Sequence, residues 1–124
     1  MKIKPLFLSL AMAGMCSQAM ANAIDQNSYA NLDDVVTTHL NLDLDVDFAD
    51  KQLEGFVEHT LQWNNSKSRT LVLDTRDLDI DKVMYEDQSG DWHKAKFSLA
   101  DRDDVKGSKL TITFKSQAKI VRIY

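Results

Sequence analysis

The sequence predicts an all-β fold, an antiparallel sandwich or saddle-like stacked sheets of about seven strands, incomplete at the C-terminal end. Apolar and polar residues alternate in several short segments, as in strands with one buried face. Polar clusters separate these segments, and no stretch after the first 21 residues has the 3.6-residue apolar period of a helix. Such a series of short strands and turns is typical of an antiparallel sandwich. The expected strands are residues 40–48, 53–63, 70–74, 78–85, 92–99, 110–114 and 120–124.

The first two expected strands form a long hairpin. Leucine, valine and phenylalanine occupy every second position of residues 40–48, and Asn or Asp occupies the positions between them. This period predicts a half-buried strand, with Leu40, Leu42, Leu44, Val46 and Phe48 on its buried face. A tight turn is expected at residues 49–51. In the returning strand the apolar residues Leu53, Val57, Leu61 and Trp63 all occupy odd-numbered positions, so they share one face.

The later strands are bounded by clear turn signals. The polar cluster at 64–68 precedes the strand 70–74, and the turn at 87–90 precedes the strand 92–99. Within 78–85 the apolar residues change from even-numbered to odd-numbered positions between Ile80 and Val83. This change predicts a bulge or a bend in the strand. A charged loop from Asp101 to Lys106 then leads to the last two strands.

The first 21 residues have the three parts of a signal peptide. Lys2 and Lys4 give a basic start, residues 5–15 are apolar, and Ala19 and Ala21 supply the small residues of a cleavage signal. The apolar run is about a dozen residues, short of the roughly 20 that a membrane-spanning helix needs. We therefore expect cleavage after Ala21, no membrane span, and an exported domain, periplasmic or extracellular, comprising residues 22–124.

Cys16 offers a second interpretation of this segment. Small residues come before a lipidated cysteine, and Ala13 and Gly14 fit that pattern, whereas Met15 does not. Lipoprotein anchoring at Cys16 is thus the alternative to simple cleavage. Cleavage after Ala21 would remove the single cysteine of the chain, which would leave neither a disulfide nor a thiolate nucleophile.

Length and charge narrow the function classes. About 100 residues after the leader allow one domain with a modest core. The chain carries 19 acidic and 15 basic residues, a net charge of −4, and the charges are interspersed. Nucleic acids and anionic membranes require clustered Lys and Arg, so neither is an expected partner.

One acidic pattern imitates a calcium loop. Asp43, Asp45 and Asp47, with Glu54 eleven positions after Asp43, match ligand positions of an EF-hand. However, Phe48 stands where the loop needs glycine, and successive carboxylates on one strand face are nearly 7 Å apart. A solvated acidic strand face is the better interpretation. The same holds for the aspartates of residues 77–81.

No other motif specifies chemistry. His39, His59 and His93 lack the helical spacing of H-E-x-x-H, and there is no G-x-S-x-G elbow or glycine-rich phosphate loop. We therefore expect no catalytic, cofactor-binding or metal-binding residues. Four aromatic residues could line a carbohydrate-binding face, although aromatics at strand parity favour the core. They are Trp63, Tyr85, Trp92 and Phe97.

Three segments resemble a known family. Residues 35–48, 71–83 and 107–112 look like parts of the N-terminal domain of the leukotriene A(4) hydrolase-like branch of the aminopeptidase N family. The resemblance implies a β-rich saddle that packs on a catalytic domain. In the family, that catalytic domain holds zinc through H-E-x-x-H and a further Glu, with the motif's Glu as general base. None of these motifs occurs here, so no site residue is carried over.

The resemblance implies a non-catalytic N-terminal scaffold of an exported zinc metallo-aminopeptidase, truncated before the catalytic domain. The expected partner is that catalytic domain, and the chain alone should not hydrolyse peptides. The alternative is a free-standing secreted β-sandwich binding module for protein or glycan. An unpaired sheet edge is expected to allow self-association. Arg76 is expected to pair with Asp74 or Asp77 and fix the turn between two strands.

Overall fold

The computed structural model describes residues 25–124. These residues form eight β-strands and no helix, which confirms the predicted all-β class. The predicted signal peptide at residues 1–21 and Cys16 lie outside the described residues. Within the described part, no helix is long and apolar enough to span a membrane.

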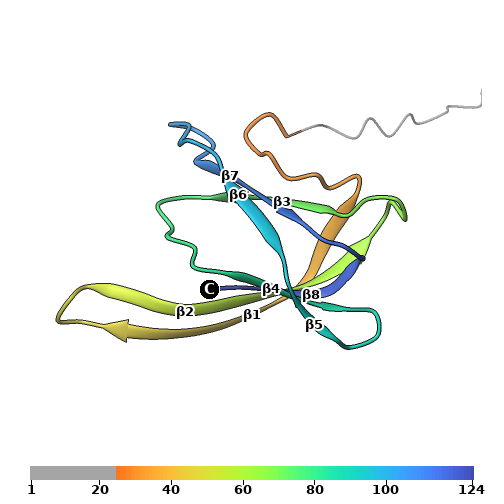
Figure 1. Ribbon diagram of the computed structural model, residues 1–124. Helices are drawn as coiled ribbons and strands as arrows, with labels where there is room; N and C mark the ends of the chain where they lie inside the picture. Colours follow the sequence, from red (N-terminus) through yellow and green to blue (C-terminus); the bar gives the residue numbers. More distant parts are fainter. Residues whose placement is uncertain (1–24) are drawn as a thin grey trace, which may run out of the picture.

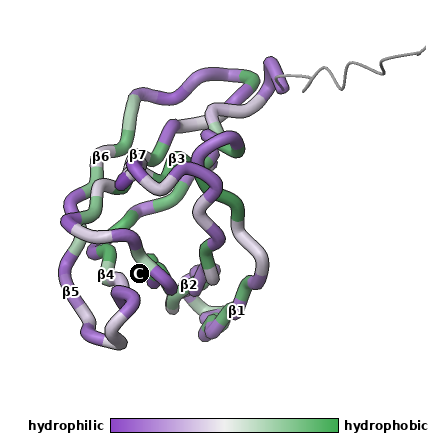
Figure 2. The backbone as a smooth tube through the Cα atoms, turned by 90° about the vertical axis from the view of Figure 1, so that its right-hand side faces the viewer, coloured by the Kyte–Doolittle hydropathy of each residue, from purple (hydrophilic) through white to green (hydrophobic). Residues whose placement is uncertain are grey.

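The strands form two antiparallel sheets, which lie on either side of an interior (Figures 1 and 2). The larger sheet has five strands in the order β1-β2-β8-β4-β5, and the smaller has three in the order β3-β7-β6. The last strand, β8, therefore lies at the centre of the larger sheet, next to β2. The strands are β1 (Val35–Asp47), β2 (Gln52–Trp63), β3 (Thr70–Thr75), β4 (Val83–Asp87), β5 (Trp92–Lys94), β6 (Lys96–Leu99), β7 (Ser108–Thr113) and β8 (Ala118–Ile123).

The core lies between the inner faces of the two sheets. Register places Val83 opposite Ile123 and Tyr85 opposite Val121, so these side chains share the inner face of the larger sheet. The smaller sheet faces them with apolar side chains from β3 and β7. The buried set is Val35, Leu61, Leu71, Val83, Tyr85, Ala95, Leu110, Ile112, Phe114, Ala118, Val121 and Ile123.

A bulge in β1 determines which side chains of the long hairpin point to the inner face of the sheet. The register between β1 and β2 shifts between Thr37 and His39. Because side chains alternate across a strand, this extra residue lets Val35 and Leu40 point to the same face although their positions differ in parity. β1 thus begins at Val35, before the predicted start at Leu40, and joins the core at its proximal end.

Two predicted strands differ from the observed ones. The predicted strand 78–85 begins only at Val83, because the Asp-rich segment before it forms a loop. The predicted bulge or bend between Ile80 and Val83 is therefore wrong, since the slip in apolar parity marks the end of this loop and not an irregularity within a strand. The predicted strand 92–99 is divided at Ala95 into β5 and β6, which belong to different sheets. The buried Ala95 donates its N–H to the carbonyl of Val83 at 2.9 Å, and the chain crosses from one sheet to the other there.

The distal half of the β1–β2 hairpin projects beyond the remaining strands (Figure 1). The prediction of a half-buried strand at 40–48 is wrong for this part, because the smaller sheet does not cover it. Leu42 is 62% exposed and Leu53 is 65% exposed, whereas Leu61 at the proximal end is 8% exposed. Phe48, predicted to lie on the buried face, is 88% exposed in the turn after β1.

Candidate interaction surfaces

The projecting hairpin carries an aliphatic surface, which we call the hairpin face. It continues the inner face of the larger sheet, because register places Leu42 opposite Val57 and Val57 opposite Ile123. Its members are each between 47% and 65% exposed: Leu40, Leu42, Leu44, Val46 and Leu53. Such a contiguous row of exposed aliphatic side chains is typical of an interaction surface.

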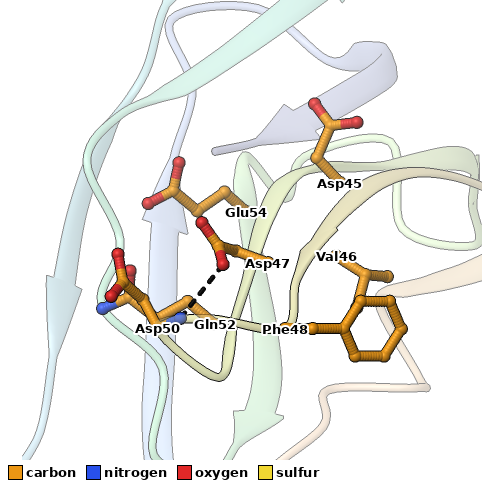
Figure 3. Close-up of a pocket in the computed structure, with 7 residues that line it drawn as sticks. All are labelled: Asp45, Val46, Asp47, Phe48, Asp50, Gln52 and Glu54. Carbon is orange, nitrogen blue, oxygen red and sulfur yellow. Dashed lines mark hydrogen bonds between the residues drawn. The ribbon is translucent and has the colours of Figure 1, made fainter.

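The opposite face of the hairpin is acidic. Asp45 lies opposite Glu54, and Asp47 lies opposite Gln52. Figure 3 shows the carboxylates of Asp45, Asp47 and Glu54 on one side of the hairpin end and Val46 and Phe48 on the other. Together with Asp50 and Gln52, these residues line an open depression. The predicted solvated acidic face is therefore present at the hairpin end.

Asp47 has a structural role in the turn after β1. Its Oδ1 accepts hydrogen bonds from the backbone N–H groups of Ala49 at 2.7 Å and Asp50 at 3.0 Å. These bonds form an Asx-type turn that returns the chain into β2. Lys51 completes the reversal with a positive φ of 55°.

A second surface lies on the outer face of the larger sheet, where the Arg122 side chain lies against three aromatic rings. Its guanidinium carbon is 4.6 Å from the centroid of Phe56, 4.7 Å from that of Trp92 and 6.0 Å from that of Tyr124. Cation–π contacts at such distances stabilise the packing of an arginine. Trp92 remains 41% exposed, so this Arg122 cluster is partly open to solvent.

The Arg122 cluster is held by an ion pair with Glu58. The Arg122 Nε donates to the Glu58 Oε1 at 2.7 Å, and the Nη2 donates to the same oxygen. Asn41 Nδ2 donates to the other oxygen of Glu58 at 3.2 Å. These two donors hold the pKa of Glu58 below its usual value, Arg122 having the larger effect. Tyr124 Oη accepts a hydrogen bond from Arg122, and this bond, followed by the Glu58 pair, raises the pKa of Arg122.

Sequence reasoning did not find the Arg122 cluster. Glu58 and Phe56 lie on the second strand, and Arg122 and Tyr124 lie at the end of the chain. Only the pairing of β2 with β8 places Glu58 directly opposite Arg122. The sequence does indicate that alternate residues of each strand share a face. It does not specify which strands are neighbours, so it could not place Glu58 beside Arg122.

The three histidines are not brought together. Leu40 lies opposite His59 on the inner face of the sheet, His39 is exposed, and His93 pairs with Asp87 at 2.9 Å. Burial lowers the pKa of His59. The hydrogen bond with His93 is the main cause of the lowered pKa of Asp87. Within residues 25–124, no group of three or more His, Cys, Asp or Glu side chains could hold a metal ion.

The four aromatic residues considered for a carbohydrate face do not share a surface. Tyr85 is buried in the core, where its ring meets that of Phe114 at a centroid distance of 5.1 Å. Trp63 packs on the same Phe114 and donates its Nε1–H to the Ala118 carbonyl at 2.7 Å. Phe97 is partly buried against the core, and only Trp92 lies on the outer surface.

The expected pairing of Arg76 is wrong. Its guanidinium donates to the backbone carbonyl of Val105 at 2.8 Å and so ties the loop after β3 to the loop before β7. Asp77 pairs instead with Arg102 at 2.7 Å. Asp74 accepts hydrogen bonds from Ser28 and Tyr29 and anchors the segment before β1. The tertiary approach of these loops decides the partners.

A family comparison matches most of the chain. Residues 36–122 match the peptidase M1 N-terminal domain. Leucine aminopeptidase 2 of Yarrowia lipolytica is 38% identical over 89 residues, which are 72% of this chain and 13% of that protein. Leucine aminopeptidase 2 of Phaeosphaeria nodorum is 33% identical over 88 residues, again 13% of its length. The chain therefore spans about an eighth of the length of these relatives.

Solved structures show the same fold. The structure of yeast leukotriene A4 hydrolase in complex with bestatin matches with a TM-score of 0.72 and 30% identity. The native enzyme from Saccharomyces cerevisiae matches with a TM-score of 0.68 and 29% identity. Each match covers 85% of this chain and 16% of the other.

Proposed function

The chain belongs to the peptidase M1 N-terminal domain family, and on that premise we propose that it is the non-catalytic N-terminal scaffold portion of an exported zinc metallo-aminopeptidase. In this role the two sheets form a rigid support on which a catalytic portion packs. The parent reaction is the removal of N-terminal residues from peptides. Zinc and the reacting groups are supplied by the catalytic portion and not by this chain.

One observation carries this proposal. Sequence and fold agree over the same region, since the family match spans residues 36–122 and the solved hydrolases superimpose on 85% of the chain. The matched relatives are aminopeptidases of which the chain represents 13%. In those relatives the matched region is one part of a larger protein, which supports the scaffold role proposed for this chain.

Export is part of the proposal and rests on the sequence of residues 1–21. The experiment is to express the full chain in a bacterial host and to determine the N-terminus of the mature product. We expect the mature chain to begin at Asn22 and to appear outside the cytoplasm. An unprocessed N-terminus, or a lipid-modified Cys16, would contradict simple cleavage.

A free-standing binding module is the second candidate function. The observation that favours it is the hairpin face, whose aliphatic side chains are exposed in the chain as described. A module would use this face to bind a protein. The two candidates differ in whether this chain can replace the equivalent part of an active enzyme.

A chimera tests the scaffold role. The matched 89 residues of Yarrowia lipolytica leucine aminopeptidase 2 are replaced by the corresponding residues of this chain. We expect the chimera to remain soluble, to unfold cooperatively and to retain measurable zinc-dependent aminopeptidase activity. The reason is that a scaffold needs only to preserve the sandwich and its contacts with the catalytic portion.

The matched control is the same chimera carrying Val121→Asp. Val121 is fully buried at the centre of the larger sheet, and an unpaired carboxylate there should unfold the sandwich and abolish activity. If the wild-type chimera folds cooperatively but is inactive, the scaffold proposal is wrong. Zinc-dependent turnover of an aminoacyl chromogenic substrate by this chain alone would also overturn it.

A further inference from the structure

The outer edge of β1 is an unpaired strand edge of unusual length. β1 is the first strand in the order of the larger sheet, and it pairs only with β2 on one side. Residues from Thr37 to Asp47 are exposed throughout, and within residues 25–124 no backbone group pairs with the other side of this segment. Alternate residues of an antiparallel strand direct their N–H and C=O groups to that side. The edge can therefore accept a further strand.

The chemistry of this edge is different on its two faces. On the inner face, Leu40, Leu42, Leu44 and Val46 belong to the exposed hairpin face. On the outer face, Asp43, Asp45 and Asp47 follow one another at every second position. No basic side chain forms an ion pair with these three carboxylates within residues 25–124. An added strand would thus meet an aliphatic row and an acidic row at once.

Charge argues against a second copy of this chain as the added strand. If two β1 edges pair with their aliphatic faces on the same side, residues of equal parity stand opposite each other. With Asp45 on the symmetry axis, for example, Asp43 of one copy faces Asp47 of the other. Each register that keeps the aliphatic faces together and is centred on a residue from 43 to 47 therefore places at least one carboxylate opposite another. Like charges directly opposite destabilise strand pairing.

We propose that the edge of β1 from Leu40 to Asp47 binds an extended segment of a partner polypeptide in which apolar residues alternate with Lys or Arg. The segment adds to the larger sheet by backbone hydrogen bonds. Its apolar side chains cover Leu40, Leu42, Leu44 and Val46, and its basic side chains lie against Asp43, Asp45 and Asp47. This inference does not rest on the proposed function, because it uses only the edge and its two rows.

The alternation is the specific part of the inference. Side chains on one face of a strand repeat about every 7 Å, so only a two-residue period matches both rows over several residues. A basic segment without alternation could neutralise the carboxylates but would leave the aliphatic row uncovered. An apolar segment without basic residues would leave the carboxylates facing uncharged groups.

The experiment uses the 124-residue chain and fluorescent peptides of the same length as Leu40–Asp47. One peptide alternates Lys and Val, a second has the same composition in two blocks, and a third alternates Glu and Val. Fluorescence anisotropy measures affinity, and backbone amide NMR shifts locate the site. We expect only the alternating Lys–Val peptide to bind with shifts along β1, and with an affinity that falls as salt is raised.

Two further peptides test for strand addition. In one peptide the backbone nitrogen of every lysine of the alternating sequence is methylated. In the other the backbone nitrogen of every valine is methylated. Because alternate residues donate their N–H to one side of a strand, one pattern removes all pairing donors and the other spares them. We expect one methylated peptide to lose binding and the other to keep it. Equal behaviour would indicate a charge contact without strand pairing and would overturn the proposal.

Protein variants complete the test. The double variant D43N and D45N should weaken the alternating peptide by roughly 2- to 30-fold, the range for two opposite-charge pairs across strands. The matched control is D101N with D104N, which changes net charge equally in an exposed loop far along the chain and should leave affinity unchanged. Equal weakening by both double variants would contradict the site. So would concentration-dependent self-association with shifts confined to β1, because the occupant would then be a second copy.

Discussion

Leu110 and Leu42 provide a matched pair for testing what holds this sandwich together. Both are leucines in strands where apolar and polar residues alternate, and both lie on the inner face of a sheet. Leu110 on β7 is 1% exposed between the sheets, whereas Leu42 on the projecting hairpin is 62% exposed. The change of each to alanine removes the same atoms, so any difference in the free energy of unfolding comes from tertiary packing.

Leu110→Ala should be strongly destabilising. Removal of a fully buried leucine costs about 2–5 kcal/mol, because the cavity adds to the lost transfer free energy. Less than two-fifths of the Leu42 surface is buried in the fold. Burial of a whole leucine side chain contributes about 1.5–3 kcal/mol to the free energy of unfolding. Leu42→Ala opens no cavity, so we expect it to cost less than about 1 kcal/mol.

The assay is urea-induced unfolding of the full chain, followed by the fluorescence of its two tryptophans. Trp63 reports on the core, since its ring packs on Phe114. At a constant m-value, the midpoint should fall much further for Leu110→Ala than for Leu42→Ala. In thermal unfolding, the first variant should lose about 10 °C or more, as expected for 2 kcal/mol in a domain of this size.

Equal losses for the two variants would refute this reasoning, because the hairpin face would then be buried in solution as deeply as the core. If Leu110→Ala does not fold, the milder pair Leu110→Val and Leu42→Val is compared. Removal of one methylene then costs about 1 kcal/mol at Leu110 and little at Leu42. A loss at Leu42 that depends on protein concentration would show that another molecule covers the hairpin.

Two further predictions concern the hairpin and its pH dependence. Gly55 has a φ of 148°, and a Cβ there would lie 2.0 Å from the carbonyl oxygen of Asp43 on β1. Gly55→Ala should therefore lower the free energy of unfolding by about 1–3 kcal/mol and make the hairpin sensitive to proteolysis. Gly90→Ala is the control, since it has a positive φ but no close neighbour, and equal proteolysis of both variants would contradict the prediction. Burial lowers the pKa of His59, so the unfolded chain binds its proton first, and stability should decrease as pH falls below 6.5. His59→Asn should reduce that slope between pH 6.5 and 5 in urea titrations, and an unchanged slope would assign the pH dependence to other groups.

Much of the strand content was predictable because two-residue periodicity is a local property. The hairpin of β1 and β2, its turn near residues 49–51 and the strands β3 and β7 all follow from alternation and polar clusters. The family resemblance, based on three segments of the sequence, is confirmed by the match of residues 36–122. Local pattern failed at Ala95, where a continuous alternation hides a crossing between two sheets, because alternation does not encode which sheet a strand joins.

The candidate surfaces were less predictable than the fold. The acidic face of the hairpin was expected from its aspartates, and the structure places it at the projecting end. The Arg122 cluster was not expected, because its ion pair joins residues 64 positions apart. The partners of Arg76 were also predicted incorrectly, since a loop far along the sequence supplies the carbonyl that it binds.

The sequence by itself determined most of the strands, the alternation along β1 and the family to which the chain belongs. It did not determine which apolar rows are buried. Leu42 and Leu110 have equivalent patterns, yet only the second sheet's position decides that Leu110 is enclosed and Leu42 is not. The physical reason is that burial depends on which surfaces meet in three dimensions, whereas periodicity specifies only which side chains share a face. The long exposed edge of β1 is therefore a property of the tertiary structure alone.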